Sequence, residues 1–434
     1  MTPFDIGLIS LAVMIVLICM GVPLAFAIGA VAIIGNSIIV GVGPTALQLY
    51  QSAFQTMTEF LMTSIPLFIL MGQLVSGGGL GRDIYSCVYK WLGWVPGGLA
   101  VTTVSSCAAL GAVTGVSSAA LGALAPIAIP EMKRYGYDNR LAAGSLASAS
   151  TLAILIPPSL AFVIYGIWTE TSIGRLFAAG LIPGLVLAAM FCVYIVIACT
   201  INPKLGPVGP SFSWRDRIVS TSALIPIIII FGGMLTGLYA GWFTPSEGAA
   251  CGCTAVAILL AAMGRLDRNN VVEALKSTAA LSVMIFTIVI AVQLFSRFLV
   301  LTDVAPRLVA TIGASGLSRY VILTIIIVLY LFLGMILDSI GMVLLTLPFV
   351  FPIIKTLGFD PVWFGIILTI MIEVGQLTPP VGLNCYILNK MAPELALSEI
   401  FAGIIPFCLI CMLAVLLFTI FPQIVLWLPN LIFG

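Results

Sequence analysis

The chain has 434 residues, of which 61% are hydrophobic and 8% are charged, and it contains no histidine. Soluble domains carry roughly 25% charged residues, so this composition cannot provide a water-exposed surface and indicates a polytopic membrane protein. The formal net charge of +1 offers no basic field for nucleic acid, and the lack of histidine removes the commonest metal ligand and proton relay.

Apolar segments of about 20 residues, long enough to cross a bilayer, follow one another along the chain and predict an all-α fold. No Lys or Arg precedes the first segment, so we expect it to remain as a span and not to be cleaved as a signal. Linkers 42–58 and 264–277 are less apolar and are predicted to be helices lying in the membrane interface. The predicted spans are 4–20, 21–41, 59–77, 138–168, 181–201, 220–241, 246–263, 278–301, 361–390 and 401–428.

Two further apolar blocks, 96–132 and 318–356, are too long for one crossing. Small and polar residues interrupt each block near its middle, at Gly111 to Ser118 and at Gly334 to Gly341. A break at half depth predicts a re-entrant hairpin that enters and leaves by the same face. Irregular backbone at that depth is tolerated where protein buries it or where it lines a wet cavity, so the hairpin tips are the first candidates for a site.

An internal repeat runs through the chain at one constant offset, the separation of Ser117 from Ser339, and such a register is not expected by chance. Threading the spans with the ends of the first hairpin in the cytoplasm leaves few basic residues on the other side, as the positive-inside rule requires. The repeats are then inverted and both termini lie outside. The matched residues are Pro23, Ser117, Pro126, Pro130, Gly136, Asp138, Pro157 and Pro158, with Pro245, Ser339, Pro348, Pro352, Gly358, Asp360, Pro379 and Pro380.

Two of the spans are predicted to be broken, 138–168 between Ser148 and Ser159 and 361–390 between Glu373 and Asn384. Each break contains two consecutive prolines, which remove backbone donors and leave carbonyl groups free to bind a cation. Inverted repeats with paired hairpins and broken spans are typical of secondary transporters, which bind substrate and coupling ion between the repeats. The pattern predicts such a site where hairpin tips and breaks meet.

Sodium is the coupling ion that these oxygen-rich segments favour. Asp338 is the strongest single candidate, because a carboxylate inside an apolar hairpin costs about 3 kcal/mol or more unless it is paired or coordinating. For the small residues the alternative is close helix packing. The candidate sodium ligands are Gly115, Ser117, Ser118, Ser150, Asp338, Ser339, Gly341, Gly375 and Thr378.

Four residues are candidates for binding the substrate: Ser117, Ser159, Gln376 and Asn384. For the two amides, a structural cap on a half-helix is the alternative. Glu373 could act as Asp338 does or could form a structural pair with an arginine such as Arg297 or Arg319. No phosphate-binding loop of the Gly-x-x-x-x-Gly-Lys-Ser/Thr type occurs, and no plausible catalytic pair, so we expect a carrier driven by an ion gradient and not an enzyme.

Taken together and in order, several stretches make the chain resemble the large membrane subunit (M, or DctM-like) of tripartite ATP-independent periplasmic (TRAP) transporters. The resemblance covers essentially the whole chain. The stretches are Met20 to Gly29, Ile65 to Gly72, Gly111 to Ala120, Ala125 to Met132, Ile156 to Ser159 and Leu377 to Asn384.

The resemblance implies an elevator-type, sodium-driven importer of organic acids in the bacterial inner membrane. It also implies two partners, a small four-helix membrane subunit and a periplasmic substrate-binding protein. The alternative is a sodium symporter of the divalent-anion or citrate type, which needs no binding protein. The implied division is scaffold in 1–58, transport domain in 59–180, scaffold and linker in 181–277, transport domain in 278–400, and a last transmembrane helix in 401–434.

Overall fold

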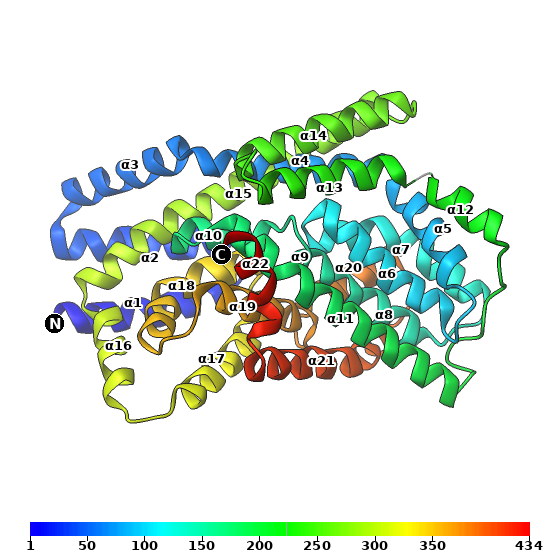
Figure 1. The fold of residues 1–434 in the computed structure, drawn as a ribbon. Coiled ribbons are helices and arrows are strands. Elements are labelled where there is room, and N and C mark those ends of the chain that lie inside the picture. The colour runs from blue at the N-terminus through cyan, green and yellow to red at the C-terminus, as the bar shows by residue number, and fades with distance from the viewer. Residues whose placement is uncertain (223) are drawn as a thin grey trace.

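The first half of the chain forms a series of α-helices with one short 3-10 helix (Figure 1). The computed structural model describes residues 1–222 and 224–434. The elements of this half are α1 (Pro3–Cys19), α2 (Leu24–Val40), α3 (Val42–Thr58), η1 (Phe60–Thr63), α4 (Ser64–Gly77), α5 (Leu80–Leu92), α6 (Gly98–Thr114), α7 (Ser117–Arg134), α8 (Asn139–Ser150), α9 (Leu152–Leu155), α10 (Leu160–Thr169) and α11 (Ile173–Ile201).

The second half repeats this order with few changes, which confirms the repeat found in the sequence. Its hairpin and broken helix follow their counterparts at nearly the spacing that separates Ser339 from Ser117. The elements are α12 (Trp214–Ser222), α13 (Ile225–Tyr239), α14 (Pro245–Ala262), α15 (Arg268–Leu301), α16 (Val304–Ala314), α17 (Arg319–Gly334), α18 (Ser339–Thr356), α19 (Pro361–Leu377), α20 (Leu383–Met391), α21 (Leu397–Ile420) and α22 (Gln423–Phe433).

Many of the helices are suited to a membrane by length and composition. Six helical segments within the described ranges are long and apolar enough to cross one, and the number rises to eight if two bent pairs each count as one span. Helices α1, α2 and α19 have 17 residues each, at the short end of the lengths that span a bilayer. The prediction of a polytopic all-α protein is confirmed.

The two predicted hairpins are α6–α7 and α17–α18. They point toward each other from opposite ends of the molecule, as inverted repeats require (Figure 1). The predicted breaks are present too: Ile156 to Ser159 separates α9 from α10, and Thr378 to Gly382 separates α19 from α20. Each break contains a cis peptide bond between its two prolines.

Three predictions about helix bounds were wrong. Residues 268–277 are not a separate interfacial helix but the first turns of α15, which runs unbroken for 34 residues because no proline or glycine interrupts it. The last span does not run through 401–428, because Pro422 follows the end of α21 and α22 starts afresh. Helix α11 begins at Ile173 and not near residue 181.

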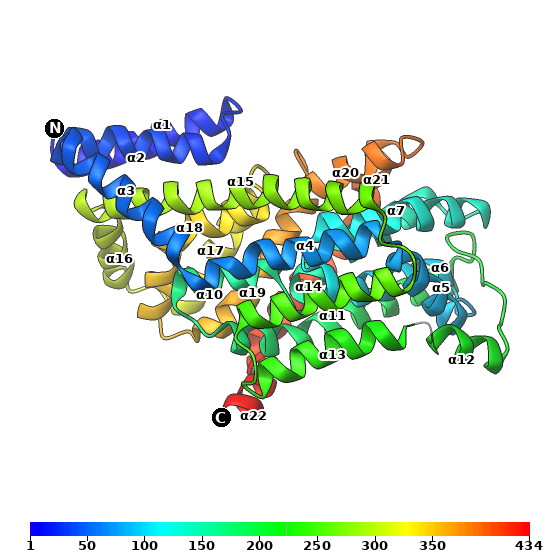
Figure 2. The same ribbon diagram turned by 90° about the horizontal axis from the view of Figure 1, so that it is seen from above.

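Two short helices were not predicted. Helix α5 connects α4 to the first hairpin, and α16 connects α15 to the second, so they are counterparts in the repeat. An ion pair between Arg265 and Asp83 joins α5 to the turn between α14 and α15. Figure 2 shows α1 and α2 at one edge of the molecule and α13 at the other, with α4 and α15 running side by side between them.

Glycines allow the closest helix contacts in the interior. A Cβ atom at Gly144 of α8 would collide with the carbonyl group of Gly403 of α21. At Gly35 of α2 the same atom would lie 2.5 Å from the Phe298 ring of α15. Small residues at helix crossings are typical of membrane proteins, where close packing replaces the hydrophobic effect as the attraction between helices.

Candidate functional site

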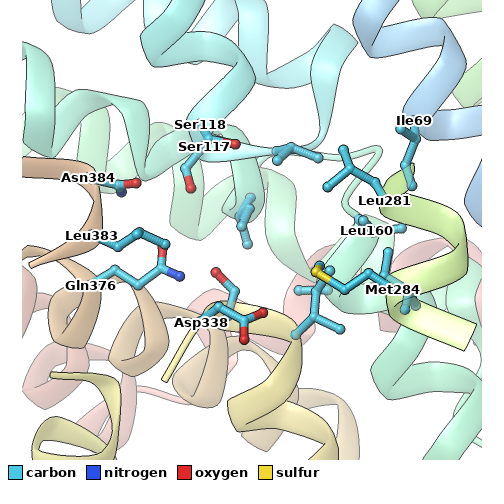
Figure 3. A pocket seen from close by; sticks show the side chains of 16 residues that line it. Ile69, Ser117, Ser118, Leu160, Leu281, Met284, Asp338, Gln376, Leu383 and Asn384 are labelled. Carbon is cyan, nitrogen blue, oxygen red and sulfur yellow. The ribbon is translucent and has the colours of Figure 1, made fainter. Parts of the chain in front are cut away.

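A cavity of about 180 Å³ lies where the two hairpin tips meet the two breaks. Figure 3 shows its polar side chains together: Ser117 and Ser118 from the first tip, Asp338 from the second, and Gln376 and Asn384 from either side of the second break. Leu160, just after the first break, completes the set of four segments. The pattern of inverted repeat, hairpins and broken spans predicted this convergence.

The first tip is a tight turn that rests on the first break. Helix α6 ends at Gly115, whose φ of +63° is in the left-handed region that favours glycine. The Gly115 carbonyl oxygen accepts a hydrogen bond of 3.3 Å from the Leu160 amide. A Cβ atom on Gly115 would lie 2.5 Å from the Pro158 carbonyl oxygen. This contact leaves Ser117 buried and Ser118 exposed at the start of α7.

The second tip carries Asp338 as the cap of α18. One carboxylate oxygen, Oδ2, accepts a hydrogen bond of 3.2 Å from the Gly341 amide, so the residue stabilises the start of the helix. Asp338 is only partly buried, because it lines the central cavity and also a second cavity of about 310 Å³ that reaches Gly21 in the α1–α2 turn. Asp338 is therefore a helix cap whose carboxylate also faces the cavity.

The second break presents amide groups. Asn384 lies in the first turn of α20, is 1% exposed, and has a side-chain nitrogen with no hydrogen-bond partner among the described residues. Gln376 lies in the last turn of α19 and is also buried. A buried amide nitrogen without a partner costs about 1–3 kcal/mol, so an acceptor in the cavity would stabilise it.

Six of the predicted residues do not line the cavity. Ser150 and Thr378 donate hydrogen bonds of 2.7 and 2.6 Å to the carbonyl groups of Ala147 and Val374, and Ser159 caps α10 by accepting from the Phe162 amide. The other three are glycines beside the tips or breaks: Gly115, Gly341 and Gly375.

The suggested pairing of Glu373 with an arginine is wrong. Arg297 lies beside the Gln51 and Gln55 side chains, and Arg319 contacts Tyr320. Glu373 is instead buried on α19, with the Ser339 hydroxyl 3.5 Å from one carboxylate oxygen, Oε1. The sequence does carry the signal for this residue, because a carboxylate within an apolar span is as costly here as at Asp338.

One wall of the cavity was not predicted. Ile69 of α4 and Leu281 and Met284 of α15 face the polar groups from the other side (Figure 3), and Ile285 also lines the cavity. These are ordinary apolar residues in apolar helices, and nothing in their sequence context distinguishes them from lipid-facing neighbours. Only the packing of α4 and α15 beside the tips gives them this role.

The donor set suits sodium and a small carboxylate. The tips and breaks provide hydroxyl, carboxylate and main-chain oxygens, which hard cations prefer, and Glu373 Oε2 is a buried oxygen without a partner among the described residues. The helices α7, α10, α18 and α20 begin at or beside the cavity, and helix N-termini favour anions. A cavity of this size admits a small molecule.

An inverted repeat with two hairpins and two broken helices around one cavity defines a membrane transporter. The model of the DctM component of the tripartite ATP-independent periplasmic transporters matches residues 11–424. The chain belongs to this family, and like its relatives it is a transporter permease and not an enzyme.

Two relatives illustrate the similarity. The large permease protein DctM of a C4-dicarboxylate TRAP transporter from Pseudomonas aeruginosa is 32% identical over 87% of this chain and 88% of its own. The large permease protein TeaC of an ectoine TRAP transporter from Halomonas elongata is 32% identical over 98% of this chain and 99% of its own.

Solved structures of other transporters share the fold. YdaH of Alcanivorax borkumensis has a TM-score of 0.58 at 15% identity, over 97% of this chain and 99% of its own. MtrF of Neisseria gonorrhoeae has a TM-score of 0.57 at 13% identity, over 89% and 85%. These similarities concern the fold alone.

Proposed function

We propose that this permease takes up a small organic acid across the bacterial inner membrane, driven by a sodium gradient. The observation that supports the proposal most is the single cavity closed by both hairpin tips and the second break, with Leu160 beside the first. Residues of both inverted halves line this site, which suits a carrier that opens it first to one side of the membrane and then to the other.

A carboxylate is the substrate group that the cavity suits best. Its polar wall offers neutral donors beside helix N-termini, among them the Ser117 and Ser118 hydroxyls and the Asn384 side-chain nitrogen, which has no partner among the described residues. The printed names of relatives include transporters of C4-dicarboxylate, ectoine and sialic acid, and each of these compounds carries a carboxylate group.

Sodium would be held by oxygens of the tips and breaks. In the first half these are Gly115, Ser117 and Ser118 with the break that follows Ser150, and in the second half Asp338, Ser339 and Gly341 with the segment from Gly375 to Thr378. The residues that line no cavity can still contribute through main-chain carbonyl groups, since the breaks leave these without helical partners.

Polar groups of the tips and breaks line one side of the cavity, and apolar residues of α4 and α15 line the other. In the proposed elevator mechanism the transport domain, 59–180 and 278–400 with its hairpins and broken helices, moves against the scaffold of 1–58 and 181–277, while the partners hold the scaffold and deliver substrate. The partners would be a small four-helix membrane subunit and a periplasmic substrate-binding protein, and both termini of this chain would lie in the periplasm.

Reconstituted transport tests the proposal. Liposomes containing the chain with its membrane partner, supplied with the loaded binding protein, should take up radiolabelled organic acid only when sodium is higher outside. Replacing the sodium gradient by an equal potassium gradient should reduce uptake at least tenfold. Uptake that is indifferent to the sodium gradient would show that sodium does not drive transport.

A further inference from the structure

Glu373 is the most deeply buried acidic residue near the cavity, and the roles given above do not include it. It lies in α19, one turn before the second break, and is 3% exposed. We propose that its carboxylate, with the hydroxyls of Ser117 and Ser339, binds a sodium ion between the two hairpin tips. In this proposal the two serines bind this ion through their hydroxyls, Asp338 binds a separate ion, and the proposal rests on the sodium coupling proposed above.

Three oxygen groups from three different elements converge at this point. The Ser339 hydroxyl at the start of α18 lies 3.5 Å from Glu373 Oε1, and the Ser117 hydroxyl at the start of α7 also approaches the carboxylate. The other carboxylate oxygen, Oε2, is buried and has no hydrogen-bond partner among the described residues. The two serines are equivalent positions of the inverted repeat, one from each half of the chain.

The separation of the Ser339 hydroxyl and Glu373 Oε1 is long for a hydrogen bond and is compatible with two ligands of one cation. A hydroxyl bonded to a carboxylate oxygen lies about 2.6 Å from it, and 3.5 Å is at the limit for any hydrogen bond. Two oxygens that bind one hard cation at about 2.4 Å, at right angles, lie about 3.4 Å apart. The separation of Ser339 Oγ and Glu373 Oε1 therefore matches an edge of a cation's coordination shell.

No positive side chain of the described residues balances Glu373. The ion pairs among the described residues are Arg265 with Asp83 and Arg307 with Asp303, and both lie away from α19. The Cys411 thiol on α21 lies near Glu373 and cannot carry a positive charge. A bare carboxylate in this interior costs several kcal/mol, which a bound cation offsets.

The position of the site would give the ion a role in coupling. Because one serine comes from each hairpin tip, an ion held by both serines ties the two tips to the broken helix α19. Together with the ion at Asp338, it provides one cation for each of the two acidic residues around the cavity.

Sodium-dependent stability of the purified chain measures binding without transport. The unfolding temperature would be recorded from 1 to 300 mM NaCl, with choline chloride keeping the ionic strength constant. A ligand that binds the folded state raises this temperature with the logarithm of its concentration. Wild type should show a steep slope, while Glu373→Gln and Asp338→Asn should each lower it to about half. Glu394→Gln removes an exposed acid from the same half of the chain and should keep the wild-type slope.

The outcomes separate this proposal from the proposed function. If wild type shows no sodium-dependent slope, the sodium coupling itself fails. If wild type shows the slope and Glu373→Gln keeps it in full, the site at Glu373 is wrong, and a proton is the remaining cation for that carboxylate. Should Glu373→Gln not fold, Ser339→Ala takes its place, and an unchanged sodium concentration for half-maximal stabilisation would equally overturn the site.

Discussion

Single residues in the cavity combine structural and binding tasks. Asp338 caps α18 and faces the cavity, and Ser159 caps α10 beside it. The sequence identified both residues as polar groups in apolar segments, but it could not show the caps, because these depend on where each helix begins. A substitution by alanine at either position therefore removes a cap as well as an oxygen, whereas Asp338→Asn keeps the capping oxygen and removes the charge.

Asn384 offers the sharpest test of substrate binding at the scale of one residue. Its side-chain nitrogen is buried and has no hydrogen-bond partner among the residues that the structure describes, so we expect it to donate a hydrogen bond to the substrate carboxylate. Losing a hydrogen bond to a charged group costs about 1.5–3 kcal/mol. Asn384→Ala should therefore raise the KM for uptake about 10- to 100-fold, as measured in liposomes with radiolabelled substrate.

Asn389 is the matched control for this substitution. It lies on the same helix, does not line the cavity, and its amide nitrogen already donates a bond of 2.8 Å to the Leu395 carbonyl. Asn389→Ala should lower the unfolding temperature and leave KM within about twofold. An equal KM for wild type and Asn384→Ala would mean that this amide does not contact the substrate.

Among the elements, the contact between each hairpin and the facing broken helix is the same in both halves. A Cβ atom on Gly111 would lie 2.7 Å from the Cα atom of Ala153, and one on Gly334 would lie 2.6 Å from that of Gly375. Ala153 and Gly375 are equivalent positions of the repeat, and Gly334 lies one residue after the position equivalent to Gly111. Small residues at these two crossings bring tip and break close enough to share ligands.

Gly115 tests the tip itself, with Gly136 as its control. Both glycines have positive φ, which costs a residue with a Cβ atom about 1–2 kcal/mol. Only at Gly115 would that atom meet another segment, the Pro158 carbonyl group, since nothing lies within 4 Å of it at Gly136. Gly115→Ala should reduce uptake at least tenfold. Gly136→Ala should keep uptake at the wild-type level, and its only effect should be the stability lost through the positive φ, measured as a smaller drop in unfolding temperature.

If Gly115→Ala and Gly136→Ala behave alike in both measurements, the contact between tip and break has no special part in transport.

Much of the arrangement of elements could be predicted from the sequence, because prolines, glycines and the constant offset between the halves mark hairpins and breaks directly. The unbroken α15 could not be foreseen, since its polar first turns look like a surface helix. The apolar wall at Leu281 depends on packing, which no single segment records.

At the scale of the whole molecule, much of the outer surface is apolar. Long apolar faces of α1, α13 and α21 are exposed in the isolated chain, for example at Val13, Ile229 and Leu413, as expected of helices that contact lipid or another membrane protein. The proposed small subunit would cover part of this surface.

Isolation from the native membrane distinguishes the proposed function from a carrier that needs no partners. A tagged chain extracted in mild detergent should bring with it a small four-span protein in about equimolar amount, identified by mass spectrometry. A binding-protein-independent symporter would instead be isolated alone and would transport its substrate in liposomes without additions. That second result would exclude the three-component arrangement.

The unbroken helix α15 has a consequence for the resting molecule. The corresponding part of the first half is divided into α3, η1 and α4, with Pro66 in the first turn of α4. Helix α15 is instead one continuous helix about 50 Å long. A carrier with identical halves would hold its site open to either side with equal ease, because each half could adopt the shape of the other. Here one half can bend where the other cannot. In the proposed cycle the two access states therefore differ in free energy before any ligand arrives, and the unloaded carrier rests on one side of the membrane.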